Sequence, residues 1–148
     1  MLVDTNLLVR TLQPHHPLHR IADGAIEMLR SQNRRLYLVP QNLIEFWTVA
    51  TRPVDVNGLG LSTAAARTEI ERLERFFTVL RETPALYPAW KRLVFEYQVS
   101  GKSTYDARLV AAMQVHGITS ILTFNPGDFR RYADIEVVDP ATVVSTGQ

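Results

Sequence analysis

The chain opens with MLVDTNLLVR (residues 1–10), in which a short apolar run ends in an acid and a second apolar run follows. This order predicts a β-strand that turns into a helix just after Asp4, as in an α/β fold. In open parallel sheets, sites form beyond the carboxyl ends of the strands, and Asp4 stands at such a position. Aspartate is also a favoured helix cap, so this stretch alone leaves a site residue and a structural cap equally open.

Strands and helices alternate along the rest of the chain. Further strands are predicted at RLYLV (35–39), within FFTVLRE (76–82), at TSILTF (119–124) and at IEVVD (135–139). Segments with helical spacing of apolar residues or helix-start signals separate them, at residues 18–33, 40–52, 63–76, 84–97 and 103–116. The pattern predicts a three-layer α/β sandwich, with a mostly parallel sheet of about five short strands and helices on both faces. We expect one domain over residues 1–140, followed by a C-terminal tail (141–148) in a loop conformation.

The composition is that of a single globular domain. The chain has 148 residues, 46% of them hydrophobic and 21% charged, and it contains no cysteine, which excludes disulfides and thiolate metal sites. No apolar run approaches the ~18 residues that a membrane span needs, and no signal peptide is recognised, so we expect a cytoplasmic protein that does not associate with membranes. The net charge is only +1, but clustering of four acids would leave 16 basic against 11 acidic residues elsewhere.

Four acids stand out by their context, and each has an ordinary structural explanation. Asp4 follows the first strand, and Asp128 lies in the turn NPGD, just beyond a later strand. Asp106 lies in STYD (103–106), which has the spacing of a helix capping box. On a helical wheel, Glu45 falls opposite the apolar stripe, on the side that would face solvent. Leu43, Phe46, Trp47 and Ala50 make up this stripe, and Glu45 shares its own side with Gln41, Thr48 and Arg52.

Four sequence motifs in order carry more information than any one of these acids. They are VDTNLLV (3–9), NLIEFWTVATRP (42–53), STYDARLVAAMQVHG (103–117) and LTFNPGDF (122–129). Together they closely resemble the motifs of the PIN domain, the nuclease fold used by VapC-type toxins of prokaryotic toxin–antitoxin pairs. The resemblance runs from Leu2 to about Asp139. It implies that the family's acidic quartet is Asp4, Glu45, Asp106 and Asp128, with Asn6, Thr123 and Asn125 at supporting polar positions.

The chemistry of such a quartet points to a divalent metal ion. Clustered carboxylates repel one another and raise each other's pKa unless a cation neutralises them. All-oxygen ligands favour Mg²⁺ or Mn²⁺, which would activate a water for in-line attack on a phosphodiester. We expect Asp4 and Asp106 to be the main ligands. Glu45 would be a ligand, either directly or through water, or would orient the attacking water, and Asp128 would complete a weaker second site. Asn6 and Thr123 would hold the carboxylates or the scissile phosphate.

The resemblance thus implies a metal-dependent endoribonuclease that acts on RNA, forms a homodimer and is the toxin partner of an antitoxin protein. The alternative is a catalytically silent PIN-fold module that works by RNA or protein binding, but a silent member would be expected to lose at least one acid of the quartet. A haloacid dehalogenase-type hydrolase would need a second acid at the position of Asn6. A receiver domain would need its phosphorylated aspartate after a central strand, whereas the second strand here ends at Pro40.

Two further clusters have weaker claims on function. His15, His16 and His19 have spacings that could bind zinc, although a loop and the first turn of a surface helix explain them better. Arg130 and Arg131 lie two and three residues after Asp128, where they could contact an RNA backbone.

Overall fold

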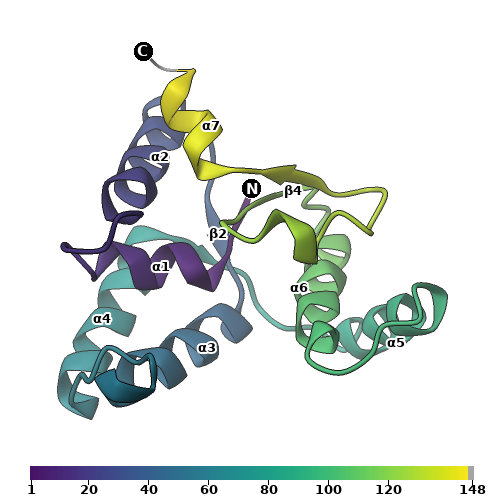
Figure 1. The fold of residues 1–148 in the computed structure, drawn as a ribbon. Helices are drawn as coiled ribbons and strands as arrows, with labels where there is room; N and C mark the ends of the chain where they lie inside the picture. Colours follow the sequence, from purple (N-terminus) through teal and green to yellow (C-terminus); the bar gives the residue numbers. More distant parts are fainter. Residues whose placement is uncertain (147–148) are drawn as a thin grey trace.

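The computed structural model describes residues 1–146 and shows strands and helices in alternation (Figure 1). The strands are β1 Leu2–Val3, β2 Tyr37–Leu38, β3 Thr78–Val79, β4 Ser120–Leu122 and β5 Glu136–Val138. The α-helices are α1 Thr5–Thr11, α2 His19–Ser31, α3 Pro40–Thr51, α4 Thr63–Phe76, α5 Leu86–Glu96, α6 Ser103–Val115 and α7 Pro140–Ser145. Two short 3₁₀ helices, η1 Val54–Val56 and η2 Pro126–Asp128, follow α3 and β4.

The five strands form one parallel sheet in the order β3-β2-β1-β4-β5. The first strand of the chain is therefore its centre, where Leu2 lies opposite Tyr37 of β2 on one side and Ile121 of β4 on the other. Because all strands run the same way, the residues that follow β1, β2 and β4 come together at one edge of the sheet. The predicted α/β fold with a parallel sheet of five short strands is confirmed.

Two hydrophobic clusters, one on each face of the sheet, hold the layers together. Leu2 and Ile121 face one cluster, which also contains the buried sides of α5 and α6. Val3 and Leu122 face the other, which is built with α1, α2, α3 and α4. The alternation along β1 and β4 is that of a strand covered on both faces. Each fully buried leucine or valine contributes roughly 1.5–3 kcal/mol to stability, so the short strands are anchored by packing rather than by length.

The C-terminal segment departs from the expected loop. Residues 140–145 form helix α7, which begins where the Asp139 side chain accepts a hydrogen bond from the Ala141 amide (2.9 Å). Val143 and Val144 of α7 pack against the second cluster, beside α2 (Figure 1). The predicted loop is wrong here because six residues are too few to show helical periodicity, although Asp139 followed by Pro140 is a helix-start signal. Residues 147–148 lie outside the described part of the chain. In residues 1–146, none of the helices combines the length and apolar character needed to cross a membrane.

Candidate functional site

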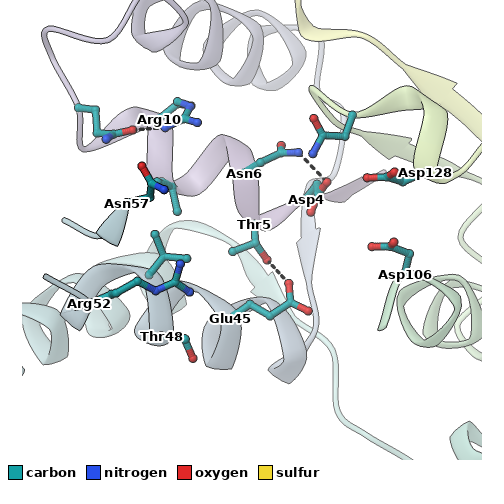
Figure 2. A pocket seen from close by; sticks show the side chains of 14 residues that line it. Asp4, Thr5, Asn6, Arg10, Glu45, Thr48, Arg52, Asn57, Asp106 and Asp128 are labelled. Atoms are coloured by element: carbon teal, nitrogen blue, oxygen red, sulfur yellow. Dashed lines mark hydrogen bonds between the residues drawn. The ribbon is translucent and has the colours of Figure 1, made fainter. Parts of the chain in front are cut away.

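A pocket of about 490 Å³ opens at the carboxyl edge of the sheet (Figure 2). The four acids that the sequence singled out, Asp4, Glu45, Asp106 and Asp128, all line it. They come from four separate segments: the end of β1, α3, the first turn of α6 and η2. The parallel sheet brings three of these segments together, since Asp4 follows β1, and α3 and η2 follow the neighbouring strands β2 and β4.

Asp4 is fixed at the junction of the two central strands. Its backbone amide donates to the Leu122 carbonyl of β4 (3.0 Å), which continues the pairing of β1 with β4 by one residue. Its side-chain Oδ2 accepts hydrogen bonds from Thr123 Oγ1 (2.6 Å) and Asn6 Nδ2 (2.9 Å). Asp4 does occupy the N-cap position of α1, but without a side-chain capping hydrogen bond. The side chain is only 8% exposed, so the fold holds this carboxylate in one orientation.

Asn6 and Thr123 form a small polar network around Asp4. The Asn6 Nδ2 group also donates to Thr123 Oγ1 (3.1 Å), and Asn6 Oδ1 accepts from the Phe124 amide (3.3 Å). Thr123 Oγ1 in turn accepts from the Asn125 amide (3.0 Å) while it donates to Asp4. Asn6 and Asn125 line the pocket, whereas Thr123 is fully buried behind Asp4. In this geometry, the sequence-predicted polar residues hold a carboxylate in place.

Glu45 is only partly exposed and lines the pocket, whereas the helical wheel placed it on an open, solvent-facing side of the helix. Its Oε2 accepts from Thr5 Oγ1 (3.0 Å), and its Oε1 accepts from Gln41 Nε2 (2.6 Å). Gln41 is only 5% exposed, whereas Trp47, which the wheel placed on the apolar stripe, is 37% exposed. The wheel was wrong because the first turns of α3 lie against α1 and the start of α6, which cover a polar side of the helix.

Sequence reasoning missed Gln41 as a site residue. In addition to Glu45, its Nε2 group donates to the Tyr105 carbonyl (2.9 Å), next to Asp106, and its Oε1 accepts from Arg108 Nη1 (2.9 Å). Gln41 therefore connects α3 with α6, the helices that carry two of the acids. The available signal was the four-residue spacing of Gln41 and Glu45, which places the two side chains on one side of a helix.

Thr5 and Asn42 were also missed. Asn42 is fully buried and donates from Nδ2 to Thr5 Oγ1 (3.3 Å), while its Oδ1 accepts from the Val39 amide (2.9 Å). These bonds link α1 to the start of α3. Because Thr5 also donates to Glu45, they help to hold the Glu45 carboxylate in place. Nothing in the sequence distinguishes Asn42 from an ordinary polar residue in the first turn of a helix.

Asp106 and Asp128 approach each other across the open side of the pocket (Figure 2). Helix α6 begins at Ser103 with Lys102 as its N-cap and carries no side-chain capping hydrogen bond, so the capping-box reading of STYD is wrong. Asp106 is free of that local role and lies toward Asp4 and Asp128. Asp128 is the last residue of η2 and is exposed. It is thus the least enclosed of the four acids.

Burial, together with the crowding of negative charge, raises the pKa of two of the acids. The pKa of Asp4 is raised to about 6, chiefly by burial and further by the charge of Glu45, against the hydrogen bond from Thr123. The pKa of Asp106 is raised to about 7, first by partial burial and then by the negative charges of Asp128, Asp4 and Glu45. Arg131 opposes this second shift. Near neutral pH the acidic end of the pocket therefore favours either a proton or a cation.

The donor set fits a hydrated divalent cation. It consists of carboxylate oxygens with amide and hydroxyl groups behind them, the ligand chemistry of Mg²⁺ and Mn²⁺. No three acidic or histidine side chains in the described part of the chain converge closely enough to chelate one ion. Mg²⁺ does not require this, since it usually keeps several waters and binds through one or two carboxylates.

The histidine cluster is engaged in local structure. His16 Nδ1 accepts from the Leu18 amide (3.1 Å), as expected of a loop that leads into a helix. His19 lies with Nδ1 2.9 Å from the Arg10 carbonyl and with Nε2 3.3 Å from an Asp23 carboxylate oxygen. These contacts favour the loop interpretation of the segment over a zinc site.

Comparison with known proteins gives one family. The family model of the PIN domain matches residues 1–135. Ribonuclease VapC48 of Mycobacterium tuberculosis (strain CDC 1551 / Oshkosh) is 27% identical over 142 residues, which cover 93% of this chain and 94% of that protein. VapBC2 from Rickettsia felis, solved bound to a promoter DNA fragment, has a TM-score of 0.70 at 12% identity, over 93% of this chain and 96% of that chain. A toxin–antitoxin complex from Klebsiella pneumoniae has a TM-score of 0.61 at 19% identity, over 94% and 96% of the two chains. Since the family model covers most of the sequence and the fold agrees with it, the chain belongs to the PIN domain family.

Proposed function

We propose that this protein is a metal-dependent endoribonuclease and that it is the toxin of a toxin–antitoxin pair. The observation that carries the proposal is the pocket in which Asp4, Glu45, Asp106 and Asp128 gather, with the pKa of Asp4 and of Asp106 raised. The ribonuclease name of the Mycobacterium tuberculosis relative supports the choice of RNA as substrate. Such a pocket suits a nuclease because its acids can hold a cation. A cation would neutralise the negative charge of a phosphodiester and activate a water for its hydrolysis.

In this proposal Asp4 and Asp106 would be the main ligands of Mg²⁺ or Mn²⁺, and Asp128 would complete a weaker second site. A bound ion would lower the pKa of a coordinated water and neutralise charge on the scissile phosphate. The chain's own contribution is to keep the carboxylates in place: Thr123 and Asn6 orient Asp4. Binding of a cation would also return the pKa of Asp4 and of Asp106 toward ordinary values, because positive charge favours ionised carboxylates.

Glu45 would orient the attacking water. Both of its carboxylate oxygens already accept hydrogen bonds, from Thr5 and from Gln41, which hold the group at the wall of the pocket. Each oxygen retains a further lone pair that can accept a proton from water. Attack by such a water on the phosphorus would give products with a 5′-phosphate and a 3′-hydroxyl.

The proposal includes two protein partners. The Klebsiella pneumoniae relative was solved as a toxin–antitoxin complex, which supports an antitoxin for this chain. An arginine from an antitoxin could enter the acidic end of the pocket, since its guanidinium pairs with two carboxylate oxygens at once. A homodimer would cover apolar surface on α5, where Tyr87 and Phe95 are exposed. Sedimentation that showed only a monomer at high micromolar concentration would remove the dimer from the proposal.

The test is RNA cleavage by the purified protein. We expect cleavage with Mg²⁺ or Mn²⁺, none with a chelator, and recovery when the metal is restored in excess. Asp106→Asn keeps the shape of the side chain and removes its charge, so it should abolish cleavage in a folded protein. Its matched control is Asp134→Asn, because Asp134 is an exposed acid that does not line the pocket. RNA binding without cleavage under all of these conditions would favour the silent binding module.

A further inference from the structure

The pocket has a second end of opposite charge. Figure 2 shows Arg10 and Arg52 on the side of the pocket away from Asp106 and Asp128. Arg10 belongs to α1 and Arg52 follows the last residue of α3, so both arise from elements that also carry site residues. Gln13 and Asn57 line the same end. One continuous pocket therefore runs from carboxylates to guanidinium groups.

The positive charge at this end has no carboxylate partner in the described part of the chain. The ion pairs in residues 1–146 involve His19, Arg67, Arg72 and Arg108, and neither Arg10 nor Arg52 takes part in one. Arg10 donates from Nη1 to Gln13 Oε1, which uses one of the five N–H donors of a guanidinium. The remaining donors of Arg10, and those of Arg52, are available to an anion in the pocket.

The backbone around Arg52 is built to a fixed shape. The loop after α3 folds back on that helix, with the Leu59, Gly60 and Leu61 amides donating to the carbonyls of Val49 (3.0 Å), Arg52 (2.9 Å) and Ala50 (2.8 Å). Gly58 is buried so closely against this turn that a Cβ there would lie 1.9 Å from the Arg52 carbonyl oxygen. The loop thus presents Arg52 and Asn57 from a defined wall of the pocket.

We propose that Arg10 and Arg52 bind a backbone phosphate of single-stranded RNA next to the phosphate that is cleaved at the acidic end. This inference rests on the proposed function. An RNA strand presents a phosphate at every nucleotide, so one strand laid along the pocket can bring one phosphate to the acids and another to the arginines. The guanidinium fork matches two phosphate oxygens, and neutral polar groups such as Gln13 and Asn57 complete such a site without competing charge. Arg10 and Arg52 are then positioning residues, which set the register of the strand.

Binding can be measured without cleavage in an Asp106→Asn background. The probe is a fluorescein-labelled single-stranded RNA of mixed sequence, followed by anisotropy in Mg²⁺ over a range of KCl concentrations. Adding Arg10→Gln and Arg52→Gln should weaken binding by about tenfold, since two charge-assisted contacts are lost. The slope of log affinity against log salt should become shallower by about 0.7 for each phosphate contact removed. Arg92→Gln removes one positive charge, as each of the two pocket substitutions does, but on the exposed side of α5, and it should leave affinity and slope unchanged.

Cleavage by proteins with the native acids provides the second readout. The double variant should show KM raised about tenfold while kcat changes by less than about twofold, since uniform binding is lost. Arg52→Lys should recover part of the affinity because it keeps the charge but not the fork. If the wild type cleaves RNA and the double variant keeps its affinity and salt slope, the phosphate site is overturned and the proposed function stands. If the wild type neither binds nor cleaves RNA, both are overturned.

Discussion

The two ends of the pocket are built in different ways. At the acidic end, Asp4 is buried and held by hydrogen bonds, one of them from Thr123, 119 residues away. At the basic end, Arg52 is exposed and rests on a loop whose hydrogen bonds reach no farther than α3. The acidic end is therefore a product of the whole fold, whereas the wall of the basic end that carries Arg52 depends on local structure. Substitutions at the acidic end should change reaction rate and stability, and those at the basic end should change binding.

The largest expected effect belongs to Asp4. Asp4→Asn should lower the rate of RNA cleavage at least a hundredfold, roughly 3 kcal/mol of transition-state stabilisation, because it removes a charge that would hold the metal. The melting temperature should stay near or rise above that of the wild type, since repulsion with Glu45 and the cost of burying a charge are both relieved. Initial rates and thermal melts on the same preparation measure both effects.

His15→Ala is the matched control for Asp4→Asn, because His15 lies in the histidine loop and does not line the pocket. It should leave the cleavage rate unchanged. If Asp4→Asn kept full activity, the cleavage would belong to another site or to a contaminant. The acidic end of the pocket would then not be where the reaction takes place.

A second effect appears in stability against pH. Asp4 has a pKa raised from 3.8 to about 6 in the folded state, so the folded state holds its proton more tightly than the unfolded state does. The resulting stabilisation is complete below about pH 4 and is lost as the pH rises through 6, and Asp106 extends the loss to about pH 7. We expect the metal-free protein to lose on the order of 3 kcal/mol of unfolding free energy over this window from Asp4, and a smaller, solvent-screened amount from the half-buried Asp106.

Urea denaturation at a series of pH values measures this loss. Saturating Mg²⁺ should reduce it, because a cation replaces the proton, and Asp4→Asn should remove the part due to Asp4. A free energy of unfolding that is flat from pH 4 to 7 in all of these samples would contradict the crowding of the acids. Substitutions at Arg52 should not alter the profile, since the basic end holds no acid.

Gly58→Ala tests the loop of the basic end. The new Cβ would overlap the Arg52 carbonyl oxygen, a backbone atom that cannot move aside cheaply. We expect a loss of about 1–3 kcal/mol in stability from overpacking and a several-fold weaker affinity for RNA. The raised pKa of Asp4, followed by NMR titration, should persist because its causes lie elsewhere. A change in the pKa of Asp4 in this variant would mean that the two ends of the pocket are structurally coupled.

Among the acids, the smallest effect on rate is expected at Asp128, so its substitution tests whether the acids contribute equally to the reaction. This acid is exposed, and no side-chain hydrogen bond fixes it among the described residues. Asp128→Asn should therefore cost about tenfold in rate, less than Asp4→Asn, with Asp134→Asn as the exposed control. It should also lower the pKa of Asp106, for which the charge of Asp128 is the largest electrostatic cause. A loss as large as that of Asp4→Asn would make Asp128 a principal ligand.

The fold and the gathering of the four acids in one pocket were predictable because local patterns and the order of the motifs encode them. An apolar run that ends in an acid marks β1 and Asp4, and the alternation of strands with helices marks the parallel sheet. The four quoted motifs singled out Asp106 and Asp128 even though each had a plain structural explanation. Their arrival in one pocket follows from the order of the strands.

What could not be predicted depends on contacts between distant segments. A helical wheel treats α3 in isolation, so it placed Glu45 and Gln41 toward solvent, where α1 and α6 in fact cover them. The same limit hid the basic end, because Arg10 lies in α1, Arg52 follows α3, and the two share no motif. Helix α7 was missed for another reason, since its stability comes from packing Val143 and Val144 on the body of the protein.

The central position of β1 has a consequence for synthesis of the chain. Asp4 is made 119 residues before its partner Thr123, and the strand β4 that fixes it immediately precedes that partner. At roughly 5–20 residues per second, about 6–24 s pass between the two. Throughout that interval the nascent chain lacks the bonds that orient the Asp4 carboxylate. The orientation of the Asp4 carboxylate is therefore fixed only after Thr123 and β4 have been made, so the acidic end of the pocket forms much later in synthesis than β1.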